Sequence, residues 1–225
     1  MKNTIISASY FMLAIIFISY GSMVSPLVAL ILKALIIPVL MLLMILNLKF
    51  SENRSNLLII LALIFSWLGD ILLGVPESTA NLFVPGLISF LLAHVMYMLV
   101  FFRTPGKNLI IPKRFYFLIP VLLYGIGLLI LLFNSLGEMK LPVTVYTIVI
   151  LTMVCSAISR YGKVNPTSWL LIFAGAILFL LSDSGIAINK FYSHFYGAQV
   201  IIMSTYVLAQ YLIVIGYIRE FKTRE

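Results

Sequence analysis

The chain has 225 residues, of which 63% are hydrophobic and only 10% are charged, and its mean hydropathy is +1.15. Soluble domains carry about 25% charged residues, so this composition excludes an ordinary water-soluble fold and indicates a protein embedded in a lipid bilayer. The net charge of +8 does not indicate nucleic-acid binding, because the basic residues flank apolar runs, where they orient a chain in the membrane.

Eight apolar runs follow one another along the chain, separated by breaks that contain polar residues, proline or glycine. Each run is long enough to cross a hydrocarbon core, which takes about 20 residues. Every backbone group inside a bilayer needs an internal partner, so we expect transmembrane helices at roughly 5–23, 27–48, 56–75, 84–102, 115–133, 142–160, 167–188 and 195–218. Because the helices of a bundle share one interior, residues 1–225 are expected to form a single eight-helix, all-α transmembrane domain.

The basic residues predict the orientation of the chain. Eight crossings would place only Lys140 and Lys190 on one side and, apart from Lys33 inside a span, all the other basic residues on the opposite side. This asymmetry predicts that both termini are cytoplasmic. In the alternative, residues 1–25 are a cleaved signal peptide and seven spans remain, but no convincing small-x-small cleavage site is present. The compact loops favour a multi-pass protein of a bacterial inner (cytoplasmic) membrane.

The acidic residues divide sharply by type. All five glutamates fall in predicted loops or near an end, whereas the only two aspartates, Asp70 and Asp183, lie inside the third and seventh spans. An aspartate at mid-membrane costs about 2.5–3.5 kcal/mol on translocon scales. Such a residue normally faces the interior of the bundle and serves a function or pairs with another polar group.

Other polar residues are predicted to share a pocket with these acids. Lys33 and both aspartates would lie at a similar depth, about 8–9 Å from the outer end of their spans. Helical spacing places Ser66 on the face of Asp70 and Tyr97 one turn from His94, which lies deeper. On the last span, a polar and aromatic stripe is expected. It comprises Tyr196, Gln199, Tyr206 and Gln210.

Three interpretations of this pocket stay open from the residues alone. The aspartates can neutralise Lys33 and hold helices together, with His94 as a bridging hydrogen-bond donor. They can serve as general acid and general base, since an apolar surrounding favours the neutral carboxyl and a nearby cation favours the charged one. They can also carry protons in a transporter. No metal or cofactor is predicted, because metal-ligand, Walker and dinucleotide-binding patterns are missing from the sequence.

Five short segments carry a family resemblance that extends from about Lys33 to Ser204. They read "LKALIIPVL", "FSWLGDILL", "GLISFLLAHVMYMLVF", "GAILFLLSDSGIAINKF" and "YGAQVIIMS". In this order, with their polar residues in register, they resemble the YhhN family of integral-membrane lysoplasmalogenases. The chain departs from the family pattern after Lys33, where Ala34 stands in place of a proline and Pro38 follows later.

The resemblance implies an eight-helix enzyme that hydrolyses the vinyl ether of lysoplasmalogens to a fatty aldehyde and a glycerophospho-base. Asp70 and Asp183 would act as the catalytic acid and base, in an order that the sequence does not assign. The supporting or substrate-binding residues would be Lys33, Ser66, His94, Tyr97, Tyr196 and Gln199. The expected partners are a lysophospholipid substrate and membrane lipid, without nucleic acid. The alternative is a proton-coupled transporter or lysolipid carrier. The shared motif "LGD" and "LSD" also hints at a duplication of four helices.

Overall fold

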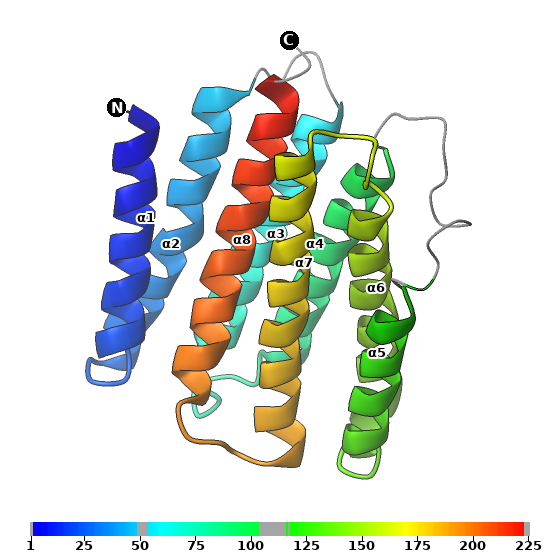
Figure 1. The fold of residues 1–225 in the computed structure, drawn as a ribbon. Helices are drawn as coiled ribbons and strands as arrows, with labels where there is room; N and C mark the ends of the chain where they lie inside the picture. Colours follow the sequence, from blue (N-terminus) through cyan, green and yellow to red (C-terminus); the bar gives the residue numbers. More distant parts are fainter. Residues whose placement is uncertain (1, 49–53, 104–115, 117, 223–225) are drawn as a thin grey trace. The chain divides into compact units, whose positions relative to one another are not determined.

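The computed structural model describes residues 2–48, 54–103, 116 and 118–222, and within these ranges the secondary structure is entirely helical (Figure 1). The α-helices are α1 (Lys2–Tyr20), α2 (Pro26–Asn47), α3 (Arg54–Gly74), α4 (Phe83–Phe102), α5 (Leu118–Leu132), α6 (Lys140–Ile158), α7 (Pro166–Ala187) and α8 (Ala198–Lys222). A short 3₁₀ helix, η3 (Gly137–Met139), precedes α6. A π-helical turn, η4 (Ile188–Tyr192), continues α7.

The helix bounds agree with the predicted spans to within a few residues. Among the described residues, seven helices are long and apolar enough to cross a membrane, and α5 is an apolar helix of 15 residues. A polytopic, all-α membrane protein is therefore confirmed. The basic residues Lys49, Lys107, Lys113, Arg114 and Arg224, which the orientation prediction used, lie outside the described residues.

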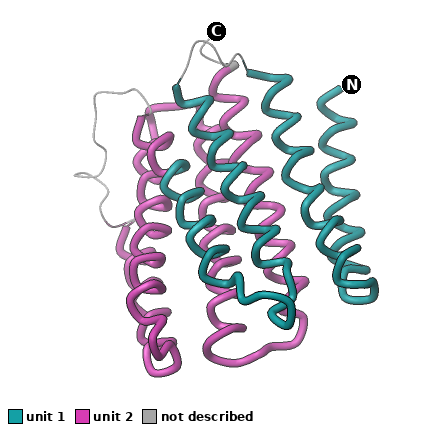
Figure 2. Tube along the Cα trace, turned by 180° about the vertical axis from the view of Figure 1, so that it is seen from behind, with its two compact units in different colours: residues 1–97 teal, residues 98–225 magenta. Residues whose placement is uncertain are grey.

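The chain divides into two compact units, residues 1–97 and residues 98–225 (Figure 2). Unit 1 contains α1, α2, α3 and most of α4. Unit 2 contains the end of α4 and the helices from α5 to α8.

In unit 1, a proline creates the link between α2 and α3. Pro38 lies inside α2 and has no backbone N–H, so the carbonyl of Ala34, one turn earlier, lacks its usual helical donor. The indole Nε1 of Trp67 on α3 donates to that carbonyl at 2.7 Å. A break in one helix thus becomes a hydrogen bond between two helices, close to Lys33 and Asp70.

Helix α3 also packs closely against α4. The hydroxyl of Ser89 donates to the Phe65 carbonyl at 2.7 Å, and a Cβ atom added at Gly69 would lie 2.6 Å from the Phe90 ring. Lipid tails are as apolar as leucine, so close packing and interhelical hydrogen bonds hold such helices together. These contacts fix the part of α3 that carries Asp70.

In unit 2, small residues join α7 and α8. A Cβ atom at Gly175 would lie 2.8 Å from the Ala209 carbonyl oxygen, and one at Gly216 would lie 2.7 Å from Ile172. The hydroxyl of Ser168 donates across the pair to the Gly216 carbonyl at 2.7 Å. This arrangement of small residues and hydroxyl groups is typical of closely approaching membrane helices.

The α7–α8 contact gives a direct stability test. Gly175→Ala should lower the melting temperature of the purified protein, because the backbone oxygen of Ala209 cannot move aside as a flexible side chain can. Gly127→Ala on α5 is the matched control, since nothing lies within 4 Å of the added Cβ atom. That variant should melt at the same temperature or slightly higher. Equal melting temperatures for the two variants would contradict the close packing.

The end of α8 corrects one expectation. The last span was expected to end near residue 218 with Glu220 beyond it, but α8 continues to Lys222, and Glu220 is only 5% exposed. Glu220 pairs with Arg160, which is 1% exposed and lies over the Phe101 ring at 5.3 Å. Arg160 is therefore a buried partner in unit 2 as well as a basic residue at the end of a helix.

Candidate active site

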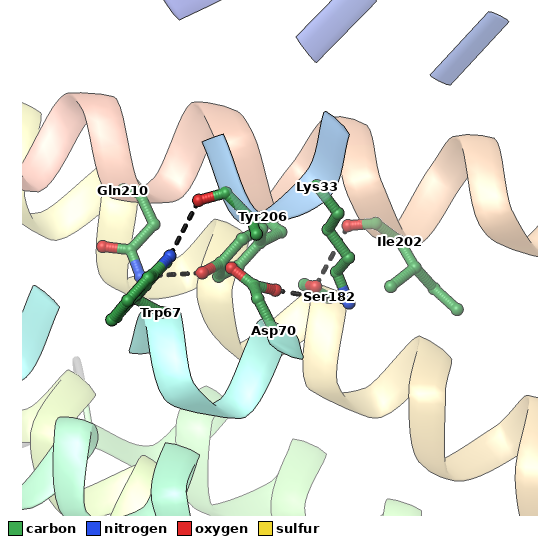
Figure 3. Close-up of polar contacts among 8 residues, drawn as sticks. Lys33, Trp67, Asp70, Ser182, Ile202, Tyr206 and Gln210 are labelled. Atoms are coloured by element: carbon green, nitrogen blue, oxygen red, sulfur yellow. Dashed lines mark hydrogen bonds and ion pairs between the residues drawn. The ribbon is translucent and has the colours of Figure 1, made fainter. Parts of the chain in front are cut away.

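Asp70 in unit 1 forms an ion pair with Lys33. The Nζ atom of Lys33 lies 3.3 Å from Oδ1 of Asp70, and the two side chains are 13% and 2% exposed (Figure 3). Lys33 comes from α2, seven residues after its start, and Asp70 from α3, four residues before its end. The predicted proximity of Lys33 to an aspartate at similar depth is observed here, and the cation favours the ionised carboxylate.

Three further predicted site residues of unit 1 are buried. Ser66, one turn before Asp70 on α3, is 0% exposed, as are His94 and Tyr97 on α4. Within the described part of the chain, the Ser66 hydroxyl oxygen has no hydrogen-bond partner. Buried hydroxyl groups are almost always bonded, so this one is a candidate for contact with a bound molecule.

Asp183 in unit 2 has a different partner. The hydroxyl of Tyr146 on α6 donates to Oδ2 of Asp183 on α7. Next to Asp183, the Ser182 hydroxyl donates to the Ile202 carbonyl of α8 at 3.1 Å, which fixes this part of α7 against α8 (Figure 3). A phenol thus orients the second aspartate, which is partly buried, whereas a cation accompanies the first.

Two predicted residues lie differently from the expectation. Helix α8 begins at Ala198, so Tyr196 stands in the turn before it with a fully exposed side chain. Gln199, in the first turn, is also exposed. Tyr206 and Gln210 are buried, with 3.5 Å between the tyrosine oxygen and the amide nitrogen. The predicted stripe is therefore wrong for Tyr196, which precedes the helix. Gln199, Tyr206 and Gln210 share one face of α8 by their spacing, with Gln199 at its exposed end.

Tyr146 was not among the residues predicted from the sequence, although a signal for it was present. The residue stands six positions after the start of α6, and Asp183 stands four positions before the end of α7. Adjacent membrane helices run in opposite directions, so these positions have similar depth. The depth argument that selected Lys33 would also have selected Tyr146.

The two aspartates thus have chemically different partners, a lysine for Asp70 and a tyrosine for Asp183. Among the residues that the structure describes, no three His, Cys, Asp or Glu side chains gather closely enough to hold a metal ion.

An apolar groove of about 480 Å³ also lies in unit 2. It does not include Asp183 or Tyr146, and it is lined by Ile126, Leu129, Ile130, Phe133, Asn134 and Thr144.

The helices and their two aspartates define a class, that of polytopic membrane proteins with one intramembrane aspartate in each of two helical units. Residues 28–217 match the model of the YhhN family. The chain belongs to the YhhN family. The matched region contains every predicted site residue, from Lys33 to Gln199.

Curated relatives are similar over most of this chain. The lysoplasmalogenase TMEM86B of Sus scrofa is 34% identical over 68% of this chain and 59% of its own length. The human lysoplasmalogenase TMEM86B is 31% identical over 71% of this chain and 62% of its own length. The lysoplasmalogenase of Mycobacterium bovis is 32% identical over 73% and 62%, respectively. The chain thus spans about three fifths of the length of these relatives. No solved structure matches it significantly.

Proposed function

We propose that the protein is a lysoplasmalogenase, an ether hydrolase that cleaves the vinyl ether of an alkenyl lysophospholipid to a fatty aldehyde and a glycerophospho-base. The observation that carries this proposal is the family match over residues 28–217, which includes both intramembrane aspartates, together with curated relatives named lysoplasmalogenase. The carboxyl groups of Asp70 and Asp183 would supply the acid and base functions that the reaction needs.

The reaction can be written with these two groups alone. A carboxylic acid gives its proton to the β-carbon of the vinyl ether, which leaves an oxocarbenium ion. The ionised carboxylate stabilises this cation and takes a proton from the water that attacks the carbon bonded to oxygen. The hemiacetal then collapses. The glycerol oxygen receives the proton just taken from water, the hemiacetal hydroxyl returns a proton to the first acid, and both groups are reset.

Asp70 and Asp183 are the proposed acid and base. Their neighbours support them: Lys33 keeps Asp70 charged or contacts the substrate phosphate, and buried Ser66, His94 and Tyr97 offer hydrogen bonds to the water or the ether oxygen. The exposed side chains of Tyr196 and Gln199 fit contact with the headgroup at the membrane surface.

We also infer eight crossings, with the apolar run at 115–133 as the fifth, and one transmembrane domain over residues 1–225. Both termini would be cytoplasmic, in a bacterial inner membrane. The support comes from the eight apolar runs and from the uneven distribution of the basic residues.

Purified protein should release a fatty aldehyde from a defined alkenyl lysophospholipid and nothing from the saturated alkyl ether of the same chain and headgroup. The saturated ether is the matched control because it binds alike but has no double bond to protonate. The same protein in proteoliposomes tests the alternative. Proton-coupled uptake of lysolipid without aldehyde release would replace the hydrolase by a transporter or carrier.

A further inference from the structure

Three helices of unit 2 repeat three helices of unit 1 after a constant interval. A shift of 113 residues places α2, α3 and α4 on α6, α7 and α8. The helix ends then agree to within a few residues, except that α8 is longer than α4 at its C-terminal end. The same shift carries Asp70 onto Asp183. Equal spacing of three successive helices and an aspartate is typical of an internal duplication.

The sequences of α3 and α7 support this repeat. Over the 21 residues of α3, seven positions are identical after the shift. The identical pairs are Ser55 and Ser168, Leu57 and Leu170, Leu58 and Leu171, Ile59 and Ile172, Ile64 and Ile177, Leu68 and Leu181, and Asp70 and Asp183. Five of the seven pairs are leucine or isoleucine, which are common in any membrane helix, so the informative pair is the aspartate, the costliest of these residues in lipid.

The buried faces repeat as well. Five buried residues of α3 map onto five buried residues of α7, and two exposed leucines, Leu57 and Leu68, map onto exposed leucines. Six buried residues of α4 likewise map onto buried residues of α8. These pairs are Phe90 and Met203, Ala93 and Tyr206, His94 and Val207, Tyr97 and Gln210, Val100 and Ile213, and Phe101 and Val214. The repeat therefore preserves helix rotation, and not only helix length.

The partners of the two acids occupy equivalent positions. The shift of 113 residues that relates the aspartates also carries Lys33 onto Tyr146. In unit 1 the residue at this position pairs with the aspartate of the next helix, and in unit 2 it donates a hydrogen bond to the aspartate of the next helix. The same position of the repeat therefore contacts the aspartate in both units. It is the lysine Lys33 in unit 1 and the tyrosine Tyr146 in unit 2.

From this equivalence, we infer that Tyr146 is the positioning residue of Asp183, as Lys33 is of Asp70, and that the difference between them makes Asp70 the base and Asp183 the proton donor. The inference rests on the proposed function. Lys33 supplies a positive charge that favours the ionised Asp70. Tyr146 donates a hydrogen bond to Oδ2 and supplies no charge, so Asp183 is the group that gives its proton to the β-carbon of the vinyl ether. The proton later returns from the hemiacetal hydroxyl, while Asp70 accepts the proton of water and passes it to the glycerol oxygen.

Tyr146→Phe tests the positioning role by kinetics. The variant should lose about 10- to 100-fold in kcat with KM within about twofold, because the hydrogen bond that stabilises the carboxylate left on Asp183 after proton transfer is lost while substrate contacts stay. Tyr217→Phe, which removes the same atom from another buried tyrosine of unit 2, should behave as the unchanged protein. In the double variant Tyr146→Phe with Asp183→Glu, the loss in kcat should be much smaller than the sum of the two single losses. In Tyr146→Phe with Asp70→Glu, the two single losses should simply add. Unchanged kcat in Tyr146→Phe, or additivity with Asp183→Glu, would overturn the role.

Infrared spectroscopy tests the assignment of acid and base without turnover. The carbonyl band of a protonated carboxylic acid should disappear in Asp183→Asn, move in Tyr146→Phe and persist in Asp70→Asn. Loss of the band in Asp70→Asn instead would reverse the assignment and overturn the inference. These spectra need no substrate, so they test the assignment even if the protein releases no aldehyde. Absence of aldehyde release would contradict the proposed function but not the protonation states assigned here.

Discussion

Asp183→Asn should lower the kcat for aldehyde release about 10²- to 10⁴-fold and leave the protein folded. Asparagine has nearly the same shape as aspartate and can still accept the hydrogen bond from Tyr146, so the local packing is kept. It has no carboxylic proton to transfer to carbon. The measurement is single-turnover aldehyde release by purified protein, with the melting temperature as a check on folding.

Asp70→Asn should cause a similar loss in kcat, but its effect on stability should differ. The substitution leaves Lys33, which is only 13% exposed, without its anionic partner. A largely buried cation that has lost this partner destabilises the folded state, so this variant should melt at a lower temperature than Asp183→Asn. Lys33→Met combined with Asp70→Asn should recover stability without recovering activity. Full turnover by well-folded Asp70→Asn would remove Asp70 from the mechanism.

The main features of the site could be predicted from the sequence because ionisable residues are rare inside membrane-spanning segments. Asp70 and Asp183 are costly in lipid, so their presence inside apolar runs was informative without any structure. Lys33 was assigned to the same layer by counting residues along its helix, and the structure places it 3.3 Å from Asp70. The helix bounds followed from apolar length alone, because a bilayer fixes how long a span must be.

The features that sequence reasoning missed depend on contacts or on helix ends. Tyr146 was missed because a tyrosine in a membrane helix is ordinary, and only its contact with Asp183 distinguishes it. Tyr196 was placed on the last helix because the predicted start, residue 195, precedes the observed start at Ala198. A difference of three residues moves a side chain around most of a helical turn and, at a helix end, off the helix.

The repeat of 113 residues shows why a short motif carried more information than its length. "LGD" and "LSD" are three residues each, and such a match arises easily between apolar helices. The structure adds the burial of each residue, and the two helices then agree in their buried and exposed faces. Duplicated helices with different partners for the acid give one scaffold two carboxyl groups of unequal character. That is the requirement of acid and base catalysis.

Arg160→Met should cause the largest loss of stability of any substitution considered, about 3–5 kcal/mol in the free energy of unfolding. Arg160 and Glu220 are 1% and 5% exposed and form an ion pair between the end of α6 and the last turns of α8. Without the guanidinium, Glu220 is a buried charge with its principal counter-ion removed, and the contact of Arg160 with the Phe101 ring is lost as well.

The matched control for this change is Lys140→Met, which removes a cation lying 4.4 Å over the Phe133 ring on the exposed surface of unit 2. Exposed contacts of this kind contribute little, so its unfolding should match that of the unchanged protein. The double variant Arg160→Met with Glu220→Leu should recover most of the loss, because two apolar side chains replace a buried pair without leaving a charge. Stability is measured by denaturant unfolding in mixed micelles. If the double variant is as unstable as Arg160→Met, the loss comes from the packing of Arg160 rather than from the charge left on Glu220.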